Sequence, residues 1–124
     1  TYVSVDGGMS DNPRPITYQS KYKACLVDRP LENVAETITL AGKHCESGDV
    51  LLNKLDLPKS KSGEFLVVFA TGAYKYSMSS NYNRIPKPAA VLVKDGHSDL
   101  IQRREQPEDL LRYDVMPERL LAVT

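Results

Sequence analysis

Short runs in which apolar and polar residues alternate recur along the chain, and they predict a protein built mainly of β-strands. The runs are rich in Val, Ile, Thr and Tyr, the residue types enriched in strands. Turn-forming residues separate them, and no helices alternate with them, which argues against a parallel α/β fold. We expect strands at residues 2–5, 22–27, 36–41, 49–52, 64–70, 89–94 and 99–103. Six or seven short strands of this kind indicate a β-barrel or a β-sandwich.

Local signals refine these expected elements. The run Glu64–Ala70 is the most apolar of the chain, so we expect a central strand that is buried on both faces. The pair Asp95-Gly96 predicts a tight hairpin. Pro107 suits the first position of a helix, and residues 108–112 are therefore expected to form a short helix. Residues 77–82 are expected to form a short helical turn.

Length and charge restrict the class of protein. With 124 residues, the chain is long enough for one domain with its own core. The 16 acidic and 16 basic residues balance, and no basic stripe indicates nucleic-acid binding. Cys25 and Cys45 are too few for a disulfide scaffold, which favours free thiols in the cytosol over a disulfide between them. The chain lacks an initial Met and strand-like alternation starts at Tyr2, so we expect it to be part of a longer polypeptide.

The densest group of reactive side chains lies between two expected strands, at residues 44–50. A loop held on a rigid scaffold is a usual place for function. The carboxylates of Glu46 and Asp49 disfavour a thiolate, so Cys45 is better suited to donate a proton than to attack as a nucleophile. The alternative is a buried, inert cysteine, the commoner state of a lone cysteine. A metal site that also includes His44 is disfavoured, because adjacent strand residues point to opposite faces.

A second candidate site surrounds Arg14. Pro13 and Pro15 flank it and predict a stiff, extended loop. A guanidinium held in this way suits two-point capture of a carboxylate, and Tyr18 follows four residues later. The alternative is a surface ion pair beside a tyrosine that only packs. A third stretch, residues 74–83, carries tyrosine and serine hydroxyls that suit either a phosphate contact or the capping of a turn.

Together, three stretches resemble the C-terminal domain of the diaminopimelate decarboxylase family. They are Val5–Pro15 with Tyr18, Cys45–Asp49, and Gly72–Asn83. They occur in the family's order and with similar spacing, and the likeness covers nearly the whole chain. The Cys-Glu-Ser-Gly-Asp run is specific, since the related ornithine and arginine decarboxylases carry other residues after the cysteine. The resemblance implies a mainly β domain over residues 1–124, a barrel or sandwich like the C-terminal domain of alanine racemase, with one or two short helices.

The resemblance also implies a cytoplasmic enzyme that depends on pyridoxal 5′-phosphate. In this family an N-terminal (β/α)8 barrel, absent from this chain, binds most of the cofactor, so the domain alone is expected to be inactive. Strand material from the N-terminus of the full chain completes the β-domain. The enzyme is a head-to-tail homodimer with shared active sites, and it converts meso-2,6-diaminopimelate into L-lysine and carbon dioxide.

Residue by residue, the resemblance implies a role for each candidate. Cys45 resembles the general acid that acts across the dimer and protonates the carbon that has lost carbon dioxide. Glu46 resembles the group that receives the distal ammonium of the substrate, while Arg14 and Tyr18 resemble the clamp on its distal carboxylate. Tyr74 resembles a tyrosine close to both substrate and cofactor phosphate, and no metal is implied. Two alternatives stay open: a free-standing, non-enzymatic β-domain that binds a diamino acid or a partner protein, and the domain of an ornithine or arginine decarboxylase.

Overall fold

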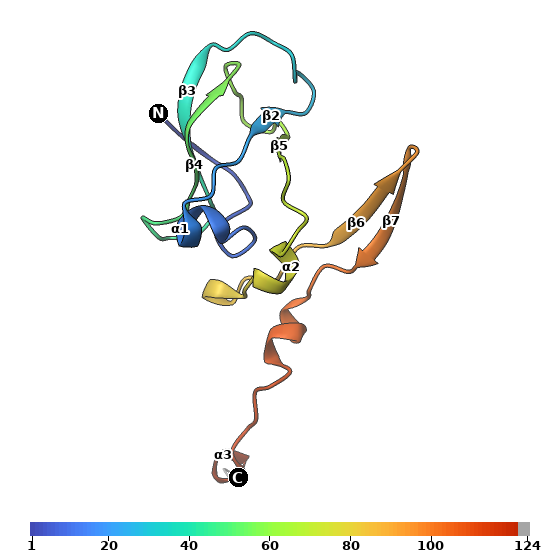
Figure 1. Cartoon of the computed structure of the whole chain (residues 1–124). Coiled ribbons are helices and arrows are strands. Elements are labelled where there is room, and N and C mark those ends of the chain that lie inside the picture. Colours follow the sequence, from blue (N-terminus) through green and yellow to red (C-terminus); the bar gives the residue numbers. More distant parts are fainter. Residues whose placement is uncertain (122–124) are drawn as a thin grey trace. The chain divides into compact units, whose positions relative to one another are not determined.

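The computed structural model describes residues 1–121, and the chain divides into two compact units, one ending at Ser80 and the other beginning at Asn81 (Figure 1). The elements of the first unit are β1 (Tyr2–Ser4), α1 (Arg14–Tyr18), β2 (Ala24–Leu26), β3 (Glu36–Ala41), β4 (Val50–Leu57), β5 (Leu66–Val68) and α2 (Lys75–Met78). Those of the second unit are the 3-10 helix η1 (Tyr82–Arg84), β6 (Ala90–Lys94), β7 (His97–Gln102), the 3-10 helix η2 (Pro107–Leu111) and α3 (Glu118–Leu121). Among the described residues, no helix is long and apolar enough to cross a bilayer.

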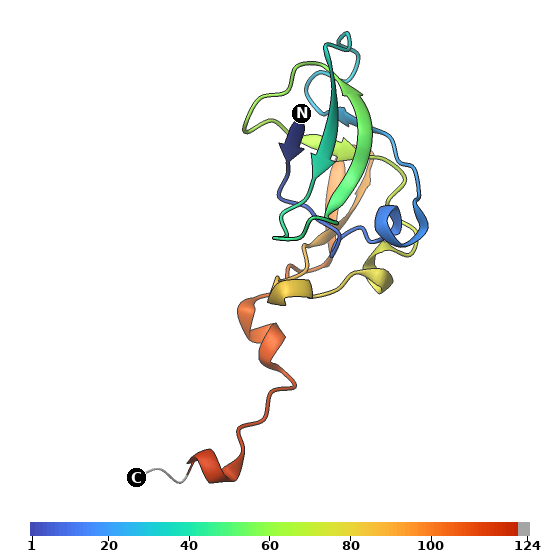
Figure 2. The same cartoon turned by 90° about the vertical axis from the view of Figure 1, so that its left-hand side faces the viewer.

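The first unit contains two sheets. In the larger sheet, β1 pairs in parallel with β3, and β3 pairs in the antiparallel sense with β4, so these strands run side by side (Figure 2). Leu40 lies opposite Leu52 in the β3–β4 register. The smaller sheet pairs β2 with β5 in the antiparallel sense and sets Cys25 opposite Val67. Both sheets belong to one core, because residues of β2 and β5 pack against the buried side chains of β3 and β4.

The core of the first unit is centred on β3 and β4. Ile38, Leu40 and Leu57 are each no more than 2% exposed. Successive side chains of a strand face opposite ways, so alternate residues of β3 point inward. Ile38 and Leu40 therefore lie in the core, whereas Thr39 between them points to the other face and is only partly buried. The partly buried residues packed on this core are Val3, Val5, Tyr22, Ala24, Leu66 and Val68.

The expected central strand at Glu64–Ala70 is wrong in this structure. β5 is shorter than that run, and within residues 1–121 it pairs with β2 alone. Leu66 and Val68 pack against the core, whereas Phe65 and Phe69 are 73% and 48% exposed. The run is apolar throughout, yet its residues alternate between a covered face and an open face, as in any strand with one buried side.

The expected extended loop around Arg14 is also wrong, because α1 begins there. Pro13 has helical dihedral angles (φ −76°, ψ −17°) and precedes the first helical turn, which contains Arg14 and Pro15. Proline suits that turn because its fixed φ is helical and the N–H that it lacks would have no helical partner. The Thr17 hydroxyl donates to the Pro13 carbonyl oxygen at 3.0 Å and further stabilises the turn.

The second unit is built around the predicted hairpin. β6 and β7 pair in the antiparallel sense, and Asp95 and Gly96 between them have positive φ values of 50° and 77°, which a type I′ turn requires. The helix expected at 108–112 is present as η2, shifted by one residue. The helical turn expected at 77–82 is divided between α2 and η1.

The mainly β fold with a few short helices is confirmed. The described residues form three separate sheets of three, two and two strands, and they close no barrel. Within this part of the chain, β1 and β5 each pair along one edge only. Such unpaired edges present backbone N–H and C=O groups that can accept a further strand.

Candidate functional site

Arg14 is held between two tyrosine rings. Its guanidinium carbon lies 5.3 Å from the centroid of the Tyr18 ring and 5.6 Å from that of Tyr74. The helix α1 places Arg14 and Tyr18 one turn apart on the same face. Tyr74 lies in the segment between β5 and α2. No carboxylate in residues 1–121 forms an ion pair with Arg14. Stacking fixes the planar guanidinium without using its N–H donors.

Tyr74 adopts a backbone conformation that is uncommon for a large side chain. It lies in the left-handed region, with φ 66° and ψ −14°, directly before α2. A non-glycine residue in this region costs on the order of 1–3 kcal/mol. The Tyr74 carbonyl oxygen accepts hydrogen bonds from Met78 N and from Ser77 Oγ, each at 2.9 Å, which hold this conformation. Tyr74 is 69% exposed, so its ring contacts Arg14 while much of the residue faces solvent.

Lys75 adds a second cation close to this cluster. Its Nζ lies 4.4 Å from the centroid of the Tyr22 ring and is buried, with no hydrogen-bond acceptor among the residues described. Burial, and to a smaller extent the positive charge of Arg14, lower the pKa of Lys75 from 10.5 to about 8. Sequence reasoning missed this residue, because one lysine in a polar stretch carries no local signal of burial.

Cys45 and Glu46 lie together on the turn between β3 and β4. Both are exposed and Cys45 is a free thiol, so Cys45 is not buried in the described chain. The turn is closed by its own backbone: Gly42 N donates to Asp49 O at 2.8 Å, and Glu46 N donates to His44 O at 2.8 Å. The side chain of Cys45 is therefore carried on a well-bonded turn rather than on a loose loop.

The buried carboxylate of Asp49 holds this turn in place through hydrogen bonds. Asp49 is 2% exposed; its Oδ1 accepts a hydrogen bond from Met9 N at 2.7 Å, and its Oδ2 accepts one from His44 N at 2.9 Å. His44 Nε2 lies 2.8 Å from Ser10 Oγ. A Cβ atom at Gly42 would overlap the Asp49 carboxylate, so a glycine is needed there. The sequence marked Asp49 as a polar loop residue, and only its fully buried position shows its structural role.

The candidate residues thus fall into two groups, and one segment joins them. Arg14, Tyr18 and Tyr74 form the stacked cluster, while Cys45 and Glu46 stand on the turn. The segment 8–11, which leads into α1, is bonded to the turn through Asp49 and His44. It also bonds to the residues after α2, because Ser80 N donates to Ser10 O at 3.0 Å. Among the described residues, no three His, Cys, Asp or Glu side chains are placed to hold a metal ion.

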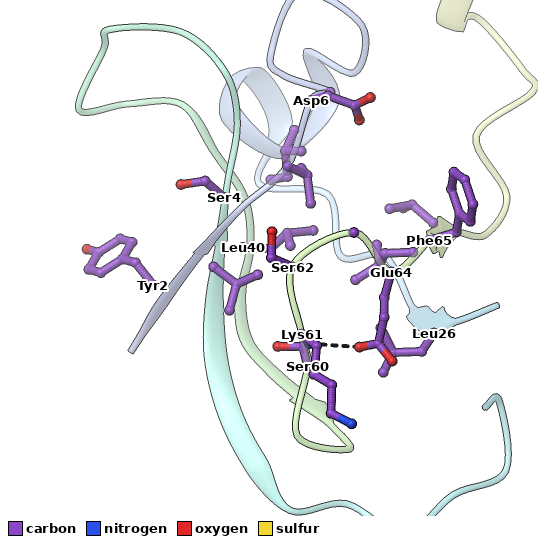
Figure 3. A pocket seen from close by; sticks show the side chains of 17 residues that line it. Tyr2, Ser4, Asp6, Leu26, Leu40, Ser60, Lys61, Ser62, Glu64 and Phe65 are labelled. Carbon is purple, nitrogen blue, oxygen red and sulfur yellow. Dashed lines mark hydrogen bonds between the residues drawn. The ribbon is translucent and has the colours of Figure 1, made fainter. Parts of the chain in front are cut away.

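A cleft in the first unit lies apart from these side chains. It has a volume of about 690 Å³ and is lined by β1 and the segment 60–66, together with Leu26 and Leu40 (Figure 3). Lys61 N donates to Glu64 Oε2 at 2.7 Å across the segment (Figure 3). None of the five candidate residues lines this cleft, so it is not the site that the sequence indicated.

Comparison with known proteins gives consistent relatives. Residues 1–72 match the family described as pyridoxal-dependent decarboxylase, C-terminal sheet domain. Diaminopimelate decarboxylases of Synechocystis sp. and Bacillus subtilis are 59% and 53% identical over 98% and 92% of this chain, which covers 26% of each. The solved diaminopimelate decarboxylase from M. jannaschii in co-complex with L-lysine superposes with a TM-score of 0.87 at 35% identity, over 96% of this chain and 27% of that one. The chain therefore spans about a quarter of the length of the relatives it matches.

Proposed function

The chain belongs to the pyridoxal-dependent decarboxylases, as their C-terminal sheet domain, and from this premise we propose that it is the C-terminal domain of a diaminopimelate decarboxylase. The whole enzyme removes carbon dioxide from meso-2,6-diaminopimelate and releases L-lysine. Two curated relatives of that name are more than half identical to nearly all of this chain, which supports the substrate. A solved relative is a complex with L-lysine, the product of this reaction.

The observation that carries the substrate assignment is the stacked guanidinium of Arg14. A fixed guanidinium suits bidentate binding of a carboxylate, and no carboxylate of the described chain occupies it. The far end of diaminopimelate bears both a carboxylate and an ammonium. In the proposed site, Arg14 and Tyr18 bind the carboxylate and Glu46 receives the ammonium. Ornithine and arginine lack the distal carboxylate, so they would leave Arg14 without a partner.

The proton donor in this proposal is Cys45. Its thiol is exposed on a hydrogen-bonded turn, with an exposed carboxylate, Glu46, as its neighbour. A general acid gives its proton to the reacting carbon, and an exposed thiol on a fixed turn can do so. The thiol donates its proton to the carbon that has lost carbon dioxide. In a head-to-tail homodimer, the turn that carries Cys45 reaches the active site of the partner subunit.

Pyridoxal 5′-phosphate fits the residues that this chain offers. The hydroxyl of Tyr74 is exposed and has no hydrogen-bond partner among residues 1–121, so it is available to a phosphate oxygen. When bound, the cofactor withdraws electrons from the reacting carbon and so allows carbon dioxide to leave. The N-terminal (β/α)8 barrel of the whole enzyme holds the rest of the cofactor.

The fold of the whole enzyme also belongs to this proposal. β1 and β5 each have a free edge in the described chain, and pairing with strand material from the N-terminal part of the enzyme would complete a barrel. The two cysteines are unpaired, which agrees with a cytoplasmic enzyme.

Replacing Cys45 by alanine in the full-length enzyme tests the proposed chemistry. We expect turnover of meso-diaminopimelate to fall by about 100-fold or more, the usual contribution of a general acid, while the absorbance of the bound cofactor is unchanged. Cys25→Ala is the matched control, because Cys25 lies in β2 opposite Val67 and outside both groups of candidate residues. Near-normal turnover of Cys45→Ala would rule out the proton-donor role.

A further inference from the structure

We propose that Asp49 is a positioning residue, whose buried carboxylate sets the place of Cys45 by tying its turn to the segment that leads into Arg14. This inference rests on the proposed function, because it concerns the proton donor of that reaction. Asp49 itself does not touch the substrate in this account. It acts through the backbone on both sides of Cys45.

Both carboxylate oxygens of Asp49 accept hydrogen bonds, each from a different segment of the chain. Oδ1 accepts from Met9 N at 2.7 Å, and Oδ2 accepts from His44 N at 2.9 Å. Hydrogen bonds to an ionised acceptor are stronger than neutral ones. Because Asp49 is only 2% exposed, water cannot replace a lost donor without reopening the structure. The carboxylate therefore works as a rigid link between the turn and the segment 8–11.

The other links of the turn lead to the segment 8–11 and to Gly7, which directly precedes it. His44 Nε2 lies 2.8 Å from Ser10 Oγ, and Lys43 N donates to Gly7 O at 2.9 Å. The Lys43 ammonium forms an ion pair with Asp11 at 2.8 Å. His44, directly before Cys45, and Asp49, four residues after it, are thus both held by hydrogen bonds. The thiol is held out into solvent between two fixed ends.

Two glycines leave the space that the Asp49 carboxylate and the His44 ring occupy. A Cβ atom at Gly42 would overlap Asp49, and a Cβ atom at Gly8 would come within 2.8 Å of the His44 ring. Both glycines lie on the two segments that Asp49 joins. The sequence therefore permits the close approach of these backbones to Asp49 and His44 at two separate positions, Gly8 and Gly42.

The test compares two substitutions that disturb the carboxylate in different ways, made in the full-length enzyme. In Asp49→Asn, the amide keeps one acceptor, but its NH₂ group faces a backbone N–H whichever way it is turned. Gly42→Ala keeps the charge and both acceptors and displaces the carboxylate by volume. We expect both to lower kcat for meso-diaminopimelate by about 10- to 100-fold, as small displacements of reacting groups do, without changing cofactor absorbance.

The matched control is Asp56→Asn, the same chemical change on an exposed carboxylate of β4 that accepts a hydrogen bond from Thr37 Oγ1. It should leave kcat unchanged. A double substitution separates positioning from general stability: if Asp49 acts through Cys45, Asp49→Asn should have little further effect on an enzyme that already carries Cys45→Ala. Losses that multiply, or variants that unfold at lower temperature but keep full turnover per bound cofactor, would overturn the inference.

Two further measurements require no turnover of the substrate, and the first of them uses the wild-type enzyme alone. In the wild-type enzyme, hydrogen exchange at the amides of Met9 and His44 should be slow and similar, since both donate to one buried carboxylate. Rapid exchange at either amide would contradict the link. The rate of alkylation of Cys45 by iodoacetamide, followed by mass spectrometry of its peptide, should change several-fold in Asp49→Asn and in Gly42→Ala but not in Asp56→Asn. A wild-type enzyme that releases no lysine refutes the proposed function, whereas equal alkylation rates refute the role of Asp49.

Discussion

Arg14 illustrates how a side chain is positioned by neighbours both near and distant in the sequence. Tyr18 is one helical turn away, and its contact with Arg14 follows from the spacing once α1 is known. Tyr74 is brought to the other contact by the tertiary fold and by its own left-handed backbone. The sequence therefore identifies the arginine and one partner, and the structure supplies the second partner and the fixed geometry.

Arg14→Lys tests whether that geometry matters for carboxylate binding. Lysine keeps the positive charge but loses both the two-point hydrogen bonding and the stacking of a planar group. We expect KM for meso-diaminopimelate to rise by about tenfold or more in the full-length enzyme, which corresponds to about 1.4 kcal/mol of binding. The cofactor absorbance serves as the control for folding. An unchanged KM would show that Arg14 is not the carboxylate clamp.

Lys75 gives a prediction about pH. Its pKa is about 8 in the folded chain, mainly because of burial, against 10.5 in the usual state. The unfolded chain therefore binds more protons than the folded chain between these two values, and stability rises with pH across that window. Lys75→Met removes this contribution, so the thermal midpoint of wild type minus that of the variant should increase between about pH 8 and about pH 10.5. A difference that stays constant or falls would contradict the burial of this ammonium.

At the scale of elements, the alternation of residues was informative where one face of a strand is covered. The predicted bounds of β3 at 36–41 are those observed, because its inward positions carry Ile38 and Leu40. The run 64–70 was misassigned because its composition does not reveal how many strands pair beside it. The region around Arg14 was misassigned because flanking prolines fit a helix start as well as an extended loop.

Leu40→Ala tests the assignment of the core to β3. Leu40 is completely buried among residues of β3 and β4, so its truncation should lower the free energy of unfolding by about 2–5 kcal/mol. Leu31→Ala is the matched control, because Leu31 is 95% exposed and the same change should cost less than about 0.5 kcal/mol. Urea titration of both variants measures the difference. Equal losses would place the core elsewhere.

At the scale of the whole molecule, we propose that the chain supplies part of a larger active site. Contiguous motifs such as Cys45–Asp49 made the family recognisable from the sequence, because their residue types and spacing survive without any knowledge of the fold. The links of Asp49 to Met9 and of His44 to Ser10 join segments far apart in the chain, so no local pattern predicts them. The catalytic unit that we propose adds a cofactor-binding barrel and a partner subunit to what this quarter of the enzyme provides.

The most direct test of this account is the substrate preference of the full-length protein. Release of L-lysine and carbon dioxide is measured with meso-diaminopimelate, and decarboxylation of ornithine and arginine is measured in parallel. We predict that kcat/KM for meso-diaminopimelate exceeds both others by about 100-fold or more, because only this substrate gives Arg14 a distal carboxylate to bind. Faster decarboxylation of ornithine or arginine, or no lysine at all, would contradict the assignment of Arg14 and of the reaction.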